Sequence, residues 1–302
     1  MTGIAILIGL LSDKLFGEPR RWHPLVGFGN AANWLEKKYN PSDSDSGKLA
    51  GLICWVILVL TTTGAVYALL SVLPTIAMFF VNCLVVYFVI GLKSLAEHGR
   101  NVAMPLMAGD LPAARQQIAM MVSRDTDNLS EQQVAAATCE SLLENGSDAV
   151  FAALFWFLLL GAPGAIVYRF ANTLDAMWGY KTDRYRQFGW AAARIDDILN
   201  WLPARLTALS YALMGSFFTA VKCSCEQGGE TDSPNAGYVM AAGAGALKVT
   251  MGGSANYQGE AHQRPVFGIG PAVASNDIER AISLVERSAI LWLAAVLLLE
   301  FL

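Results

Sequence analysis

Two apolar stretches, Leu49–Leu73 and Ile76–Leu92, follow each other in this 302-residue chain with Pro74 in the turn between them. A helix crosses a hydrocarbon core of about 30 Å with roughly 20 mostly apolar residues. The connection is too short for anything but a helical hairpin, so the pair predicts two membrane-spanning helices. Hydrophobic residues make up 54% of the chain and charged residues only 15%, which does not suit two soluble domains. We therefore expect an all-α, polytopic integral membrane protein.

Further apolar stretches extend this expectation. Three of them predict membrane spans: Ala149–Tyr168, Leu206–Val221 and Ser288–Leu302. A fourth, Ala236–Val249, is a weaker candidate. The apolar segment Ile4–Leu11 lacks the basic leader and cleavage site of a secretory signal, so we expect a short helix that brings Asp13 to the membrane interface. A net charge of −4 without a long basic run argues against nucleic acid as a partner. We treat residues 1–302 as one membrane-embedded domain, compatible with a homo-oligomer.

Two polar tracts, Ser123–Asp148 and Asn172–Arg205, flank the apolar segment Ala149–Tyr168. A single crossing would place them on opposite sides of the bilayer. Because Gly161-Ala-Pro-Gly164 interrupts the segment, we expect a re-entrant pair of half-helices that brings both tracts to one face, which is tolerated where the backbone lines a protein cavity. Lysines flank the first hairpin on one side, which the positive-inside rule assigns to the cytoplasm: Lys37, Lys38, Lys48 and Lys93. The sequence therefore predicts polar interfacial helices and a cytoplasmic site between the tracts.

The first tract predicts an acidic helix. Ser130 and Gln133 have the spacing of a capping box, so a helix begins near Glu131. It carries Glu140, Glu144 and Asp148 at four-residue intervals on one face. Three stacked carboxylates repel one another unless a cation lies among them. The alternative interpretation is an acidic face that is merely solvated.

The second tract predicts a polar helix whose charged groups share one side. Arg194, Asp197 and Arg205, or else Asp196 and Asn200, have the spacing of one helical face, and tryptophans bracket them as interface anchors do. The alternative is an interfacial amphipathic helix whose charges face water. Arg124, Arg194 and Arg205 are the arginines nearest the acidic groups and are candidates to clamp an anion, although surface arginines occur without that role.

The common nucleotide and nucleophile motifs are absent from the sequence. Gly243–Lys248 has the wrong spacing for a P-loop, so its glycines more readily serve helix packing. There is no Gly-x-Ser-x-Gly elbow. His23, in a charged and turn-rich segment, suggests either a bound anion or a structural corner. A nucleotide would have to be held by Mg²⁺ between carboxylates and phosphates, and the candidate ligands are Glu140, Glu144, Asp148, Asp196 and Asp197.

These residues fall within motifs that follow one another along the chain. The motifs are Asp13-Lys-Leu-Phe-Gly17-Glu18-Pro19 with His23-Pro24, Ser123-Arg-Asp-Thr126, Glu140-Ser-Leu-Leu-Glu144-Asn145-Gly-Ser-Asp148, Tyr168-Arg-Phe-Ala-Asn172-Thr-Leu-Asp175, Ala193-Arg-Ile-Asp-Asp197 with Asn200 and Arg205, Ser233-Pro-Asn235-Ala-Gly237, and Gly252-Gly253 with Tyr257 and Gly259. In their order and spacing the chain resembles the CbiB/CobD family of cobalamin biosynthesis, the adenosylcobinamide-phosphate synthases.

The resemblance implies an ATP-dependent amide ligase of the bacterial inner membrane. Its substrates would be adenosylcobyric acid and (R)-1-aminopropan-2-ol or the O-phosphate of this amine, with activation of the carboxylate as an acyl phosphate. ATP and Mg²⁺ would be held by Glu140, Glu144 and Asp148, or by Asp196 and Asp197. Asp125 would orient or deprotonate the attacking ammonium. Other membrane enzymes of cobalamin assembly would be candidate partners.

The resemblance also carries the expected roles of individual residues. Catalytic roles fall to Asp125, Glu140, Glu144 and Asp197. Substrate-binding roles fall to Asp13, Glu18, His23, Arg124, Thr126, Asn145, Asn172, Asp175, Arg194, Asn200, Arg205, Asn235 and Tyr257. Two alternatives remain open, because no recognisable nucleotide motif is present: a non-catalytic membrane scaffold that binds corrinoids, and a regulatory membrane protein of the AmpE type, which shares the general layout.

Overall fold

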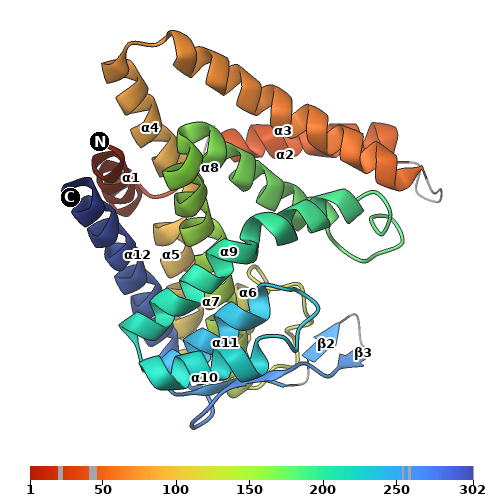
Figure 1. Cartoon of the computed structure of the whole chain (residues 1–302). Coiled ribbons are helices and arrows are strands. Elements are labelled where there is room, and N and C mark those ends of the chain that lie inside the picture. Colours follow the sequence, from red (N-terminus) through yellow and green to blue (C-terminus); the bar gives the residue numbers. More distant parts are fainter. Residues whose placement is uncertain (20–22, 41–45, 254, 258–259, 302) are drawn as a thin grey trace. The chain divides into compact units, whose positions relative to one another are not determined.

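The computed structural model describes residues 1–19, 23–40, 46–253, 255–257 and 260–301, and of these it describes 255–257, 260–262 and 301 by their backbone alone. The described chain is almost entirely helical (Figure 1), as expected for an all-α protein. The helices are α1 (Thr2–Phe16), α2 (Pro24–Tyr39), α3 (Gly47–Val72), α4 (Thr75–Val89), α5 (Leu92–Met107), α6 (Leu111–Ile118), α7 (Glu131–Gly146), the π-helical turn η1 (Ser147–Phe151), α8 (Ala152–Trp178), α9 (Trp190–Met214), α10 (Phe217–Gln227), α11 (Ala236–Leu247) and α12 (Asp277–Phe301).

Four short strands form two antiparallel pairs in the described part of the C-terminal third. β1 (Thr250–Gly252) pairs with β4 (Val266–Gly268), and β2 (Ala255–Tyr257) pairs with β3 (Glu260–His262). The strand pairs lie between α11 and α12 in the sequence, so they interrupt an otherwise helical chain.

Membrane-spanning character is confirmed for most of the predicted segments. Among the described residues, four helical stretches are long and apolar enough to cross a membrane: Gly47–Val72, Thr75–Met107, Glu131–Trp178 and Asp277–Glu300. They cover nearly all of the predicted hairpin helices, the whole of Ala149–Tyr168 and most of Ser288–Leu302. α11, with 12 residues, is apolar but too short to cross. The protein is therefore a multi-pass membrane protein.

The predicted span Leu206–Val221 is wrong. α9 ends at Met214 and α10 begins at Phe217, so no continuous helix covers the segment. The reason is the close approach of α11: a Cβ atom on Gly215 would lie 2.6 Å from the Ala246 Cβ atom, and the Ser216 N–H donates to the Ala246 carbonyl oxygen at 3.0 Å. The chain turns where this tertiary contact replaces the next helical hydrogen bonds.

The chain divides into two compact units, each built from discontinuous segments. The first unit comprises Met1–Gly91, Ala152–Asn200 and Val296–Leu302, and the second comprises Leu92–Phe151 and Trp201–Ala295. The expectation of one domain over the whole chain stays a prediction. Each unit has its own polar cluster, described below.

The core of the first unit is a cluster of buried apolar side chains from α2, α3, α8 and α9. Phe28 of α2 stacks on Phe170 of α8, with ring centroids 3.9 Å apart. Trp178 and Phe188 meet edge to face at 4.9 Å. Gly51 of α3 allows a close approach, because a Cβ atom there would lie 1.9 Å from the Phe188 carbonyl oxygen. This packing fixes α8 and the beginning of α9 relative to the hairpin helix α3.

Helix α8 contains the interruption that the sequence predicts. Gly161 has φ 66° and ψ −155°, values that a helix does not adopt and that favour glycine. A Cβ atom on Gly164 would lie 2.5 Å from the Trp156 carbonyl oxygen, so the two halves of α8 pack tightly at the break. The ribbon of α8 changes direction here (Figure 1). The break is confirmed, and the re-entrant path through a bilayer stays a prediction.

In the second unit, α7 is mostly buried. The capping box is confirmed: the Gln133 N–H donates to Ser130 Oγ at 3.3 Å, and Gln133 Oε1 accepts from the Ser130 N–H at 2.9 Å. Small residues of α11 let it approach α7, since a Cβ atom on Gly243 would lie 2.5 Å from the Leu143 side chain. The glycines of 243–248 therefore serve helix packing, as the sequence favoured.

A matched pair of glycine variants in α3 tests the packing of the first unit. Gly51→Ala is expected to lower the stability by about 1–3 kcal/mol, because the added methyl group overlaps the Phe188 carbonyl oxygen. Gly64→Ala in the same helix meets no atom within 4 Å and is expected to leave stability unchanged or slightly raised. Thermal unfolding in detergent measures both variants. Equal midpoints would contradict the contact between α3 and the turn at Phe188.

Candidate functional site

The first unit brings together four polar residues of the second tract and one tyrosine that precedes it. Asp196 of α9 is 8% exposed and accepts from two amides, Asn200 Nδ2 at 2.9 Å and Asn172 Nδ2 at 3.3 Å. Tyr168 of α8 completes the set, because its hydroxyl donates to Asn200 Oδ1 at 2.9 Å. Asp175 of α8 lies close enough to raise the pKa of Asp196. We call Tyr168, Asn172, Asp175, Asp196 and Asn200 the amide–carboxylate cluster.

The electrostatics of this cluster favour a proton or a cation. Burial, and then the neighbouring Asp175 carboxylate, raise the pKa of Asp196 to about 7, against the two amide hydrogen bonds that lower it. Asp197 is more exposed, and its pKa is raised by burial and lowered by Arg194 and Lys181. The Arg194 guanidinium is 3.8 Å from Asp197 and is 65% exposed. Arg194 therefore lies at the solvent-facing edge of the site.

The N-terminal motif of the first unit forms a structural corner. His23 caps α2, with Nδ1 accepting from the Leu25 N–H at 3.2 Å. Burial lowers the pKa of His23, Glu18 raises it and Arg169 lowers it, so the neutral ring that accepts this bond is favoured. Asp13 is 1% exposed near the end of α1, the helix predicted over Ile4–Leu11. The corner interpretation of His23 is observed, and substrate contacts of Asp13, Glu18 and His23 stay predictions.

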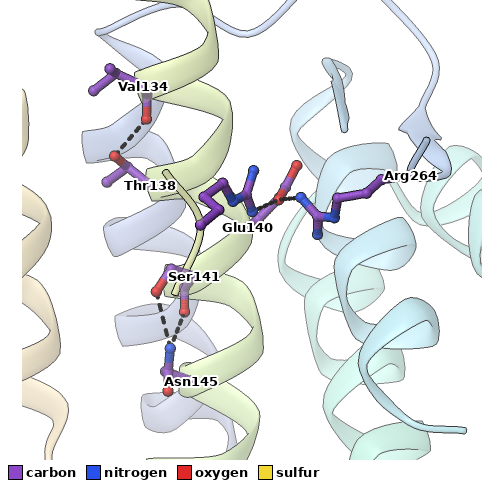
Figure 2. A network of polar contacts seen from close by, with 7 residues as sticks. Val134, Thr138, Glu140, Ser141, Asn145 and Arg264 are labelled. Carbon is purple, nitrogen blue, oxygen red and sulfur yellow. Dashed lines mark hydrogen bonds and ion pairs between the residues drawn. The ribbon is translucent and has the colours of Figure 1, made fainter. Parts of the chain in front are cut away.

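In the second unit, a buried ion cluster surrounds Glu140. Its side chain is 2% exposed, and Oε2 accepts from Arg124 at 2.5 Å and from Arg264 at 2.6 Å. Figure 2 shows Glu140 directed from α7 toward Arg264, which precedes β4 in the sequence. Thr138 bonds within its own helix to the Val134 carbonyl oxygen at 2.7 Å. We call Arg124, Glu140 and Arg264 the arginine–carboxylate cluster.

The acidic face predicted on α7 is not continuous. The α-helix ends at Gly146 and is followed by the π-helical turn η1, which contains Asp148. The wider π turn takes Asp148 out of the four-residue register with Glu140 and Glu144. Tyr211 packs against this point, because its hydroxyl donates to the Leu143 carbonyl oxygen at 2.9 Å. Single π turns within helices are frequent at functional sites.

The other predicted residues of the second unit lie around these elements. Asn145 donates to the carbonyl oxygen and the hydroxyl of Ser141 at 2.8 and 3.1 Å (Figure 2). Thr126 is buried and Asp125 is exposed.

Arg205 donates to Asn235 Oδ1 at 2.6 Å, to the Trp201 carbonyl oxygen at 3.0 Å and to the Pro234 carbonyl oxygen at 2.9 Å. The side chain of Tyr257 and the residue Gly259 lie outside the described residues.

The described residues offer Mg²⁺ a pair of neighbouring carboxylates and not a set of three or more ligands. In the part of the chain that the structure describes, no group of three or more histidine, cysteine or acidic side chains is arranged to hold a metal. Glu140 is already neutralised by guanidinium groups, which repel a divalent cation. Of the predicted ligands, Asp196 lies beside Asp175, which was expected to bind substrate, and Mg²⁺ typically takes one or two protein carboxylates together with water and phosphate oxygens. The pair satisfies that requirement.

Sequence reasoning missed two residues of these clusters. Tyr168 stands four residues before Asn172 and seven before Asp175 on one face of α8, a helical spacing that would have identified it. Arg264 lies 124 residues from Glu140 and has no local pattern around it. The sequence could not have found it without the fold.

Comparisons with known proteins place the chain in a family. The CobD/Cbib protein family matches residues 6–285. A "Cobalamin biosynthesis protein CobD" of Stutzerimonas stutzeri (strain A1501) is 50% identical over 294 residues, covering 97% of this chain and 96% of the relative. The protein of that name from Chromobacterium violaceum is 51% identical over 298 residues, with 97% and 95% covered. One from Halalkalibacterium halodurans is 36% identical over 306 residues, with 98% and 96% covered. No solved structure matches the chain. The chain therefore belongs to the CobD/Cbib family.

The stability of the metal-free protein should depend on pH through Asp196. Its pKa is raised from 3.8 to about 7, so folding takes up a proton between these values. The contribution is complete below about pH 4 and is lost as the pH rises toward 7, with a slope of at most about 1.4 kcal/mol per pH unit. Thermal unfolding in chelator between pH 4.5 and 7.5 measures the slope. Asp196→Asn should flatten it, whereas Asp183→Asn, an exposed change, should not; equal slopes for all three proteins would contradict the buried position.

The hydroxyl of Tyr168 should stabilise the amide–carboxylate cluster. Tyr168→Phe removes the donor to Asn200 Oδ1 in a buried position, which we expect to cost about 1–2 kcal/mol. Tyr67→Phe is the matched control, because Tyr67 of α3 is 66% exposed. Unfolding midpoints in detergent compare the two. A loss of the same size in both variants would contradict the role assigned to Tyr168.

Proposed function

We propose that this CobD/Cbib family member acts in cobalamin biosynthesis as an ATP-dependent amide ligase. It joins the free carboxylate of adenosylcobyric acid to (R)-1-aminopropan-2-ol O-phosphate, or to the unphosphorylated amine, and works at the cytoplasmic face of the bacterial inner membrane. Support for the pathway comes from the family and from the names of relatives that are 50% and 51% identical over nearly the whole chain. The reaction type and the substrates are what the family resemblance implies, and the polar clusters described above support them.

The reaction needs the carboxylate to be activated, because a carboxylate does not acylate an amine at neutral pH. In the proposed route, a carboxylate oxygen attacks the γ-phosphorus of ATP and ADP leaves. The amine then attacks the acyl carbon, loses a proton and expels inorganic phosphate. Both steps move negative charge between phosphate oxygens, so the protein has to hold phosphates and stabilise the charge that develops.

One observation carries the proposal: the first unit buries the Asp196 carboxylate among amides and beside the half-buried carboxylate of Asp175. Asp175 of α8 lies near enough to Asp196 of α9 to act on its charge, and Asn172 and Asn200 hold Asp196 in place. A bound Mg²⁺ would supply the charge that compensates the pair and would bridge to ATP phosphates. Arg194, exposed beside Asp197, is positioned to contact a phosphate from the solvent side. A proton or a cation has to compensate the charge of the pair, and in the proposed function that cation is Mg²⁺.

The test is a ligation assay with purified protein in nanodiscs, measuring ADP and amide from adenosylcobyric acid, Mg-ATP and the amine phosphate. Loss of partners around a metal ligand typically costs 10–100-fold, so Asp196→Asn should lower the rate by at least about 100-fold. It should also raise the Mg²⁺ concentration needed for half-maximal rate. Asp183→Asn is the matched control and should retain wild-type activity.

The assay also separates the alternatives. Corrinoid binding by the wild-type protein without ADP or amide formation would support the scaffold interpretation and contradict the ligase. Failure to bind any corrinoid would favour a regulatory protein of the AmpE type.

A further inference from the structure

The arginine–carboxylate cluster contains an unusual buried atom. Glu140 Oε2 accepts hydrogen bonds from the guanidinium groups of Arg124 and Arg264. Glu140 Oε1 is buried and has no hydrogen-bond partner among the described residues. A buried carboxylate oxygen without a donor costs free energy comparable to a lost charged hydrogen bond. Buried polar atoms of this kind therefore call for an explanation, and a donor supplied by a ligand is one.

The two arginines of the cluster are more exposed than its carboxylate. The side chain of Glu140 is 2% exposed, whereas those of Arg124 and Arg264 are 11% and 20% exposed. Arg124 comes from the loop before α7 and Arg264 from the segment before β4, so two irregular segments place the guanidinium groups over a carboxylate held on a rigid helix. A ligand would meet the arginines first and Glu140 behind them (Figure 2 shows Arg264 and Glu140).

We infer that the arginine–carboxylate cluster binds a small zwitterion with a primary ammonium group and a phosphate group. The ammonium donates to Glu140 Oε1, and the phosphate contacts the guanidinium groups of Arg124 and Arg264. This inference rests on the proposed function, whose amine substrate in its phosphorylated form carries both groups. It adds Arg264 to the residues of the site and assigns the amine half of the reaction to the second unit.

The chemistry of the three side chains suits both ends of such a ligand. A carboxylate offers about four acceptor positions, and the two arginines contact one of the two oxygens of Glu140. An ammonium supplies three donors and fits the remaining oxygen. Guanidinium groups prefer phosphate because their planar donors match its oxygens. A metal ion would suit Oε1 less well, because two cations already lie at Oε2.

The arrangement also makes the two ends depend on each other. Because Glu140 orients both guanidinium groups, a neutral side chain at position 140 removes the ammonium acceptor and loosens the phosphate contacts. A ligand that lacks either charged group leaves one half of the cluster without its partner. The site should therefore prefer the complete zwitterion over either half.

Binding is tested without ATP or corrinoid, by titration calorimetry of the full chain in nanodiscs. The probes are (R)-1-aminopropan-2-ol O-phosphate, (R)-1-aminopropan-2-ol, which lacks the phosphate, and isopropyl phosphate, which lacks the ammonium. We expect the zwitterion to bind at least tenfold more tightly than either half. Equal affinity for the zwitterion and isopropyl phosphate would overturn the inference.

Variants assign the contacts. Glu140→Gln should remove the preference for the zwitterion over isopropyl phosphate. Arg264→Lys keeps the charge but loses the planar donors, so it should weaken zwitterion binding at least tenfold. Its unfolding midpoint should stay near that of the wild type. This second variant keeps the test valid if Glu140→Gln fails to fold. Arg287→Gln is the control, since Arg287 is exposed and bonds to the Ser283 carbonyl oxygen of its own helix. Wild-type binding in Arg264→Lys would overturn the inference.

The outcome for this site is distinguishable from the outcome for the ligase. A wild-type protein that forms amide, combined with an Arg264→Lys variant whose KM for the amine phosphate is unchanged, overturns the site and leaves the ligase. A wild-type protein that binds the zwitterion selectively but forms neither ADP nor amide overturns the ligase and supports the site.

Discussion

Polar groups that lie inside apolar helices have to find their partners within the protein, because neither lipid nor a dry core supplies hydrogen bonds. Thr138 uses its own helix, Ser147 contacts Thr207 at 3.3 Å, and Tyr168 contacts Asn200. Asp196 likewise accepts from Asn172 and Asn200, but it lies beside a second carboxylate, Asp175. Glu140 Oε1 is one of several buried polar atoms without a hydrogen-bond partner among the described residues, and it is the one that lies between two arginines. We propose that the chemistry of the protein takes place at these two positions.

The parts of the fold that the sequence predicted correctly are those set by local patterns. The hairpin of α3 and α4 follows from apolar length and Pro74, the start of α7 follows from the capping pair Ser130 and Gln133, and the break in α8 follows from glycine and proline. The predicted span Leu206–Val221 was wrong because the turn at Gly215 depends on contact with α11. Asp148 does not continue the predicted spacing of Glu140 and Glu144, because a π turn follows α7 and no local residue pattern specifies that turn.

The candidate site was predictable to a similar extent. Asn172, Asp175, Asp196 and Asn200 were predicted as site residues of the second tract, with Asp196 and Asn200 on one helical face. The structure brings all four together in the first unit, where α8 and α9 pack against each other. Glu140 was expected to bind metal, but the structure surrounds it with arginines, one of them 124 residues away. Long-range ion pairs of this kind leave no periodic signal, so only the fold could reveal that Arg264 contacts Glu140. The joining of both polar tracts into one site stays a prediction.

In the proposed reaction, carboxylates of the first unit hold the Mg-ATP that activates the corrinoid carboxylate, and the arginine–carboxylate cluster of the second unit binds the amine. The proposal depends on phosphorylation of the corrinoid carboxylate, which an isotope label can detect. Adenosylcobyric acid carrying ¹⁸O in its free carboxylate is incubated with the protein, Mg-ATP and the amine phosphate, and the released phosphate is analysed by mass spectrometry. The account predicts transfer of a labelled oxygen to inorganic phosphate with each amide formed. Label in AMP, or amide formation without any transfer of label, would contradict it.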